Sequence, residues 1–96
     1  MYEIQYSKAA ERYFKKIKNK HLLSAFKAAI DRLKINPYIG QAKTGDLCGI
    51  WSFDVKYAKV NYEIAHRIYE INKHLVVVIL AGTRENFYEE LKRLVK

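Results

Sequence analysis

The chain begins with two patterns of different period. Residues 2–6 alternate apolar with polar side chains, which is the period of a half-buried strand. After Ser7, a residue type that caps helices, apolar residues recur every three or four positions for about three turns, and again over residues 20–33. Asn36 and Pro37 end this pattern, because the residue before a proline is pushed out of the α region. The pattern predicts a strand and then two amphipathic helices that form an antiparallel hairpin.

The second half of the chain returns to a period of two. Residues 38–49 contain three glycines and predict a loop, after which residues 50–57 and 62–69 alternate apolar with polar side chains. An apolar run at residues 75–81 predicts a buried strand, and Thr83 is placed to cap a last helix. The predicted order is β-α-α-β-β-β-α. We therefore expect an α+β fold with an antiparallel sheet, two N-terminal helices on one face and a C-terminal helix.

The alternation along the predicted strands also assigns residues to faces of the sheet. The apolar set faces the helices, and the alternate set falls on the opposite face. We expect that opposite face to be open to solvent. Its side chains are Asp54, Lys56, Glu63 and Arg67.

Charge is distributed unevenly along the chain. The 96 residues, enough for a single domain over residues 1–96, carry a formal net charge of +8. Residues 1–34 hold nine Lys or Arg against three acids, whereas residues 35–96 hold nine against seven. This asymmetry favours a nucleic acid, an anionic membrane or an acidic protein as partner. The alternative is a solvated helical face whose lysines only aid solubility.

Two further features indicate the compartment. Cys48 is the single cysteine, so no intrachain disulfide forms and a reducing compartment is expected. The N-terminal residues lack the apolar run of a signal peptide, and no stretch is long enough to span a membrane. The expected localisation is cytoplasmic, with no membrane partner.

Two local motifs resemble those of a known family. GDLCGIWS at residues 45–52 is similar to the loop-and-strand entry of YoeB-like proteins, and AGTRENFYEELKR at residues 81–93 resembles the last strand and helix of RelE-, YoeB- and YafQ-like proteins. With the predicted element order, the chain resembles bacterial type II toxins of the RelE/ParE superfamily over nearly its whole length. The resemblance implies a RelE-like fold.

The resemblance also implies an activity and partners. Members of these branches are mostly ribosome-dependent endoribonucleases that cut mRNA and inhibit translation. An adjacently encoded antitoxin holds them inactive, so a toxin–antitoxin hetero-oligomer is expected. The ParE branch shares the fold but inhibits DNA gyrase without catalysis, and a degenerate member would only bind its antitoxin. Fold alone does not choose among these activities.

Metal-free RNA cleavage needs a base for the 2′-hydroxyl, an acid for the leaving 5′-oxygen and cations for the phosphoryl oxygens. Arg84 is the strongest candidate cation, since it follows Gly82-Thr83 at the predicted helix start, where related toxins carry a catalytic Arg or His. Tyr88 lies four residues later, so it is expected on the same helical side as Arg84, and it matches a functional aromatic of YafQ-like toxins. Its ring would stack on a base or its hydroxyl would donate a proton, or it would only pack at the helix–sheet seam.

The remaining candidates lie on the predicted strands and helices. Arg67 and Lys56 would bind phosphate, and Lys59, which is expected in a turn, is a further candidate for RNA binding. The base would be Asp54, Glu63 or His66, although the alternation places His66 with the core residues. The basic helices would contact ribosomal RNA without reading its sequence. Their basic residues are Lys8, Arg12, Lys15, Lys16, Lys18 and Lys20.

Two departures from the family pattern involve acids. Phe53-Asp54 stands where YoeB-like toxins carry basic residues, and Glu63 falls near the strand arginine of RelE-like toxins. These acids would either serve as the general base or weaken phosphate binding. The three histidines lack metal-ligand spacing, so neither a metal nor another cofactor is expected.

Overall fold

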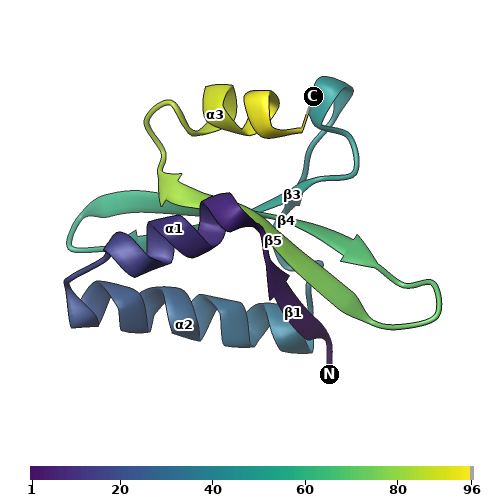
Figure 1. The fold of residues 1–96 in the computed structure, drawn as a ribbon, viewed down its shortest axis with the longest axis horizontal. Helices are drawn as coiled ribbons and strands as arrows, with labels where there is room; N and C mark the ends of the chain where they lie inside the picture. Colours follow the sequence, from purple (N-terminus) through teal and green to yellow (C-terminus); the bar gives the residue numbers. More distant parts are fainter. Residues whose placement is uncertain (96) are drawn as a thin grey trace.

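A computed structural model describes residues 1–95 of the chain as a five-stranded sheet with helices on both faces (Figure 1). The predicted α+β class is therefore confirmed. The elements are β1 (Glu3–Tyr6), α1 (Lys8–Lys16), α2 (Lys20–Ile35), β2 (Gln41–Ala42), the 3₁₀ turn η1 (Gly45–Leu47), β3 (Trp51–Tyr57), β4 (Val60–Tyr69), β5 (Leu75–Thr83) and α3 (Phe87–Leu94). None of the described helices is long and apolar enough to cross a membrane.

The sheet has the strand order β1-β5-β4-β3-β2. Strands β3, β4 and β5 form the predicted antiparallel meander. The prediction of a purely antiparallel sheet is wrong, because β1 pairs parallel with β5, with Glu3 opposite Leu75. The predicted loop also contains β2, which places Gln41 opposite Ser52, and the turn η1. A strand of two residues is too short to produce a period in the sequence.

The helices lie on opposite faces of the sheet. In Figure 1, α1 and α2 cover one face and α3 lies over the other, above the strands. The face that was expected to be open is therefore partly covered by α3 and η1, and each face has its own core. The core under α1 and α2 includes Phe26, Leu33, Val55, Ile64 and Val78. The core under α3 includes Leu47, Ile50, Ala65, Leu80, Phe87 and Leu91.

The helix starts were predicted with mixed success. The Ser7 Oγ accepts a hydrogen bond from the Ala10 amide at 3.1 Å, which confirms Ser7 as the cap of α1. The predicted cap at Thr83 is wrong, because β5 continues through Thr83, which pairs with Tyr62. The last helix begins at Phe87, after Asn86 in the left-handed region with φ of 59°.

One cluster of polar side chains ties β1 and the segment after α2 to the end of β4. The Glu70 carboxylate accepts hydrogen bonds from the hydroxyls of Tyr38 and Tyr2, the latter at 2.7 Å, and contacts His74 Nδ1 at 2.8 Å. These bonds favour the carboxylate and lower the pKa of Glu70 to about 2. The bond to Glu70 raises the pKa of Tyr2 to about 12. The cluster closes the end of the sheet at the β4–β5 hairpin.

Candidate catalytic site

The register of the sheet brings two acids side by side. Asp54 on β3 lies opposite Glu63 on β4, and Glu63 lies opposite Gly82 on β5. Two residues beyond Gly82, the Arg84 amide donates a hydrogen bond to the carbonyl of Asn61 at 3.0 Å. This bond holds the Arg84 backbone beside β4, so its side chain begins close to both acids.

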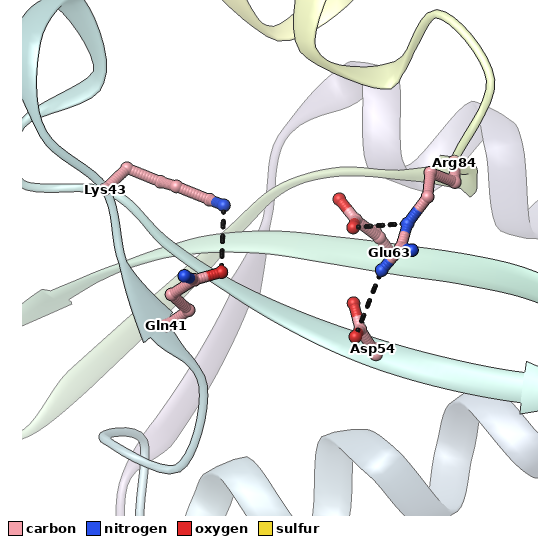
Figure 2. Close-up of polar contacts among 5 residues, drawn as sticks. All are labelled: Gln41, Lys43, Asp54, Glu63 and Arg84. Atoms are coloured by element: carbon pink, nitrogen blue, oxygen red, sulfur yellow. Dashed lines mark hydrogen bonds and ion pairs between the residues drawn. The ribbon is translucent and has the colours of Figure 1, made fainter.

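The Arg84 side chain contacts both carboxylates (Figure 2). Its Nε donates to Glu63 Oε1 and its Nη2 donates to Asp54 Oδ2, each at 3.2 Å. The bond to Glu63, followed by the charge of Asp54, raises the pKa of Arg84 above its ordinary value. Arg84 and Asp54 are each 55% exposed, so solvent screens their half of the cluster. The cation that the sequence singled out is thus present but already paired.

Glu63 differs from the prediction in its burial. Its side chain is only 2% exposed, although the alternation placed it on a face expected to be open. Oε1 accepts from Arg84, whereas Oε2 is buried and finds no hydrogen-bond partner among residues 1–95. A buried carboxylate oxygen without a donor is costly, and such groups occur where function requires them. Glu63 therefore combines a fixed orientation with a buried oxygen that lacks a hydrogen-bond donor among these residues.

Lys43 was not predicted from the sequence. It is half-buried, and its Nζ lies 4.6 Å from the centroid of the Tyr88 ring and donates to Gln41 Oε1 at 3.3 Å. Figure 2 shows Lys43 and Gln41 over the same side of the sheet as Arg84, with the Lys43 side chain extended toward the acids. A lysine in a glycine-rich segment carries no period or motif, so only its tertiary position identifies it.

Tyr88 occupies the seam between α3 and the sheet. It is half-buried and packs against the α3-side core, and its ring meets the Phe87 ring edge-on at 5.5 Å. The prediction that Tyr88 shares a helical side with Arg84 is wrong, because Arg84 precedes α3 by three residues. Phe87 is buried, as expected of a core residue.

The other predicted cations on the strands lie at different distances from the cluster of Arg84 and its two acids. Lys56 is exposed on β3 opposite Asn61, next to Asp54 along the same side of the strand. Lys59 lies in the β3–β4 turn with φ of 66°, as predicted. Arg67 is half-buried and lies four residues from Glu63 along β4, about 13 Å away at the rise of a strand. Arg67 therefore does not join the cluster.

His66 lies outside the site. It is fully buried, and its Nε2 is 2.8 Å from the carbonyl oxygen of Pro37, which follows α2. It is next to Ala65 of the α3-side core, so its side chain points to the opposite face, toward α2. Burial lowers the pKa of His66, although the bond to Pro37 opposes this. His66 is therefore a core residue, and the structure does not bring it together with Arg84 and the two acids.

The basic helical hairpin is exposed, as predicted. All six of its named basic side chains, Lys8, Arg12, Lys15, Lys16, Lys18 and Lys20, are exposed. A cavity of about 410 Å³ lies between α1, α2 and β1, and its lining includes Lys15 but neither Arg84 nor the two acids that Arg84 contacts. Within residues 1–95, no three His, Cys, Asp or Glu side chains gather at a spacing that would hold a metal ion.

The charges of the site nearly cancel. Arg84, Lys43 and Lys56 carry three positive charges, and Asp54 and Glu63 carry two negative charges. One side of the sheet thus carries three groups. They are the Glu63 carboxylate, which has one oxygen unpaired within residues 1–95, the Arg84 guanidinium, which is paired with acids, and the Lys43 ammonium, which contacts the Tyr88 ring. This arrangement is suited to proton abstraction beside an anion.

Comparisons with known proteins place the chain in a family. The family model described as the ParE-like toxin of type II bacterial toxin-antitoxin systems matches residues 4–92. The chain belongs to this family. The resemblance to toxins of the RelE/ParE superfamily is thereby confirmed, and the protein is a toxin of a type II toxin–antitoxin system. A comparison with curated proteins finds no match.

Two solved structures share the fold of this toxin. A chain of the toxin–antitoxin complex RelBE2 from Mycobacterium tuberculosis superposes with a TM-score of 0.65 at 21% identity, covering 86% of this chain and 98% of that chain. The E. coli toxin RelE, in the free state and with two arginines replaced by alanine, superposes with a TM-score of 0.71 at 18% identity, covering 96% of each chain. At these identities the likeness establishes the RelE-like fold.

Proposed function

We propose that this toxin is a metal-independent, ribosome-dependent mRNA endoribonuclease that inhibits translation. The observation that carries the proposal is the pairing of a buried carboxylate, Glu63, with the exposed cation Arg84. Glu63 Oε1 is fixed by Arg84, while Oε2 has no donor among the described residues. A base and a phosphate-binding cation in contact are two of the three kinds of group needed for cleavage that uses the 2′-hydroxyl of the RNA, and solvent water supplies the proton for the leaving oxygen.

The proposed reaction needs no cofactor. Glu63 Oε2 is buried in the free toxin, so the side chains that cover it have to move when RNA binds. Oε2 then takes the proton from a 2′-hydroxyl, and the 2′-oxygen attacks the adjacent phosphorus. The bond from phosphorus to the 5′-oxygen then breaks, the leaving oxygen takes a proton from solvent water, and a 2′,3′-cyclic phosphate remains. Glu63 afterwards releases its proton to solvent. Arg84 stabilises the charge that gathers on the phosphoryl oxygens. Positioning of the mRNA by the ribosome lowers the number of protein groups required.

Arg84 has to exchange a partner to bind phosphate. Its contact with Asp54 joins two exposed side chains, whereas its contact with Glu63 joins the exposed Arg84 to a buried carboxylate. A phosphate therefore replaces Asp54 more readily than Glu63. Asp54 would then lie near a second anion, so we expect Asp54 to oppose substrate binding and not to act as the base.

Cleavage of a translated mRNA by purified toxin tests the proposal. We expect Arg84→Ala to abolish cleavage and Glu63→Gln to lower the rate by about 10²–10⁴-fold, the range for loss of a general base. The control, Asp54→Asn, is expected to cleave at least as fast as the wild type. Primer extension locates the cuts, and circular dichroism verifies that each variant is folded. Full activity of Arg84→Ala or Glu63→Gln would contradict the assignment.

A gyrase inhibitor without catalysis is the second candidate. The pairing of Arg84 with two acids favours it, since that pairing neutralises the cation a phosphate would need. The matching family model is also of ParE-like toxins. Gyrase-dependent DNA breaks after induction, with intact transcripts, would support this candidate. A folded protein with no effect on growth would instead indicate a degenerate member that only binds its antitoxin.

The proposed partners are the ribosome with its mRNA and a cognate antitoxin encoded beside the toxin. The similar M. tuberculosis structure is of a toxin–antitoxin complex, which supports an antitoxin partner and a hetero-oligomer. The exposed basic hairpin of α1 and α2 supports a ribosomal RNA partner. The proposed localisation is the cytoplasm, where ribosomes are found.

A further inference from the structure

Lys43 is fixed at the site by both its backbone and its side chain. Its amide donates to the Ile50 carbonyl at 2.9 Å, which joins the segment after β2 to the start of β3. Its Nζ lies over the Tyr88 ring and donates to Gln41 Oε1. Gln41 in turn is held opposite Ser52 by the β2–β3 pairing. A lysine on an exposed segment is ordinarily mobile, so three restraints on one residue call for an explanation.

The partners of Lys43 leave its charge unneutralised. An aromatic face and a neutral amide orient the ammonium group, whereas Arg84 is paired with two carboxylates. Lys43 has no carboxylate within ion-pair distance in residues 1–95. It also lines a cavity of about 300 Å³ that Thr44, Asp46, Leu47, Tyr88 and Lys92 complete. The ammonium group is therefore oriented and charged at the edge of an open space.

We propose that Lys43 binds a phosphodiester of single-stranded RNA next to the one at Arg84, and that Tyr88 is a positioning residue that holds Lys43. The location of the cleaved phosphate rests on the proposed function, but the contact of Lys43 with RNA does not. The Lys43 backbone joins β3 at Ile50, near the level of Arg67 on β4, but the extended Lys43 side chain carries its charge toward the acids (Figure 2). The Tyr88 ring has Lys43 Nζ over one face, so a base stacked on that face would have to displace Lys43.

Binding of a labelled RNA tests Lys43 without requiring cleavage. The probe is a short single-stranded RNA with 2′-O-methyl groups, measured by fluorescence anisotropy over a series of salt concentrations. We expect Lys43→Met to weaken binding roughly tenfold. We also expect it to lower the slope of log affinity against log salt by about 0.7, the value for one phosphate on a single strand. The matched control is Lys73→Met, at the exposed β4–β5 turn, which should change neither quantity.

Variants of Tyr88 distinguish three roles for this residue: holding Lys43 in place, stacking on an RNA base, and donating a proton through its hydroxyl. Tyr88→Phe keeps the ring, so we expect wild-type binding and cleavage. Tyr88→Leu removes the cation–π contact and should behave like Lys43→Met, and the double variant should be no weaker than either single variant. Additive losses would show that Tyr88 contacts the RNA independently, and loss of cleavage in Tyr88→Phe would assign a role to the hydroxyl. Either outcome would overturn the positioning role.

The two assays fail in different ways. Unchanged affinity and salt slope in a folded Lys43→Met variant would overturn the proposed phosphate contact, whether or not the toxin cleaves mRNA. The wild type could also bind RNA through Lys43 and yet cleave no translated mRNA. That result would support the phosphate contact of Lys43 and contradict only the proposed endoribonuclease activity. A wild type that does not bind the probe would overturn the contact as well.

Discussion

At the scale of single residues, β4 presents two buried titratable groups to opposite faces of the sheet. Glu63 points toward Arg84, and His66 points toward the carbonyl of Pro37. Each has one buried polar atom without a partner in the described part of the chain, Oε2 of Glu63 and Nδ1 of His66. The Glu63 oxygen lies beside an exposed cation, whereas His66 is surrounded by core residues. The first is therefore a candidate for chemistry, and the second affects stability.

Burial of His66 predicts that stability depends on pH. Its folded-state pKa is lowered, so below about pH 6.5 the unfolded chain binds a proton that the folded protein does not. The free energy of unfolding should therefore fall as pH decreases below about 6.5, by about 1 kcal/mol per unit until the folded pKa is reached. The Glu70 carboxylate, with a pKa of about 2, does not change charge in the folded protein in this window.

Urea unfolding one pH unit above and one below that value measures the effect. The comparison variant is His66→Gln, which keeps an amide donor for the Pro37 carbonyl but does not titrate. We expect its free energy of unfolding to change less between the two conditions than that of the wild type. An equal pH dependence in both proteins would show that His66 is not responsible.

The sequence allowed part of the site to be predicted. Arg84 and the two acids were recognised as candidates, because the family motif and the alternation of β3 and β4 identify them. The burial of Glu63 was missed, since alternation shows which face a residue points to but not what covers that face. Lys43 was missed because its partners, Gln41 and Tyr88, come from a two-residue strand and a helix more than forty positions apart.

At the scale of elements, the segment of β2 and η1 forms one side of the site. It supplies Gln41 and Lys43, and it packs Leu47 against the core under α3. Its approach to β3 depends on Gly40. A Cβ at position 40 would lie 2.1 Å from the Ser52 carbonyl oxygen and 2.9 Å from the Ser52 carbonyl carbon, both rigid backbone atoms. Only glycine allows the chain to pass this close to β3.

Replacing Gly40 by alanine should therefore separate β2 from β3. We expect Gly40→Ala to lower the free energy of unfolding by about 1–3 kcal/mol, the cost of overpacking, and to weaken RNA binding by displacing Lys43. The control is Gly45→Asn, because nothing lies within 4 Å of a Cβ there and asparagine tolerates its φ of +63°. Thermal and urea unfolding measure the difference. Equal free energies of unfolding for Gly40→Ala and wild type would mean that the β3 backbone can shift to accommodate the added Cβ without loss of stability.

Elements were predicted best where a hydrophobic pattern repeats over many consecutive residues. The bounds of α2, expected from about Lys20 to the residue before Asn36, agree with Lys20–Ile35. The start of α3 was wrong because the pairing of Thr83 with Tyr62 extends β5 past the local cap signal. The parallel pairing of β1 with β5 joins residues about seventy positions apart, so no local pattern reports it.

At the scale of the whole molecule, positive charge and candidate chemistry lie on different elements. The site carries a net charge near +1, whereas α1 and the start of α2 expose six basic side chains. Figure 1 shows that hairpin on the face of the sheet opposite α3. The charge asymmetry of the sequence therefore concerns binding of the ribosome more than bond cleavage, and the two functions should be separable by mutation.

Neutralising the hairpin should affect binding and leave catalysis intact. In a variant with Lys15, Lys16, Lys18 and Lys20 all changed to Gln, each lost phosphate contact should reduce the salt slope of ribosome binding by about 0.7–0.9. Because Arg84 contacts Glu63 and Asp54 and none of these four side chains, KM for programmed ribosomes should rise while kcat is unchanged. Cleavage rates against ribosome concentration at low and high salt measure both constants. A fall in kcat at unchanged KM would mean that the hairpin takes part in the chemical step, and it would remove the separation between docking and catalysis.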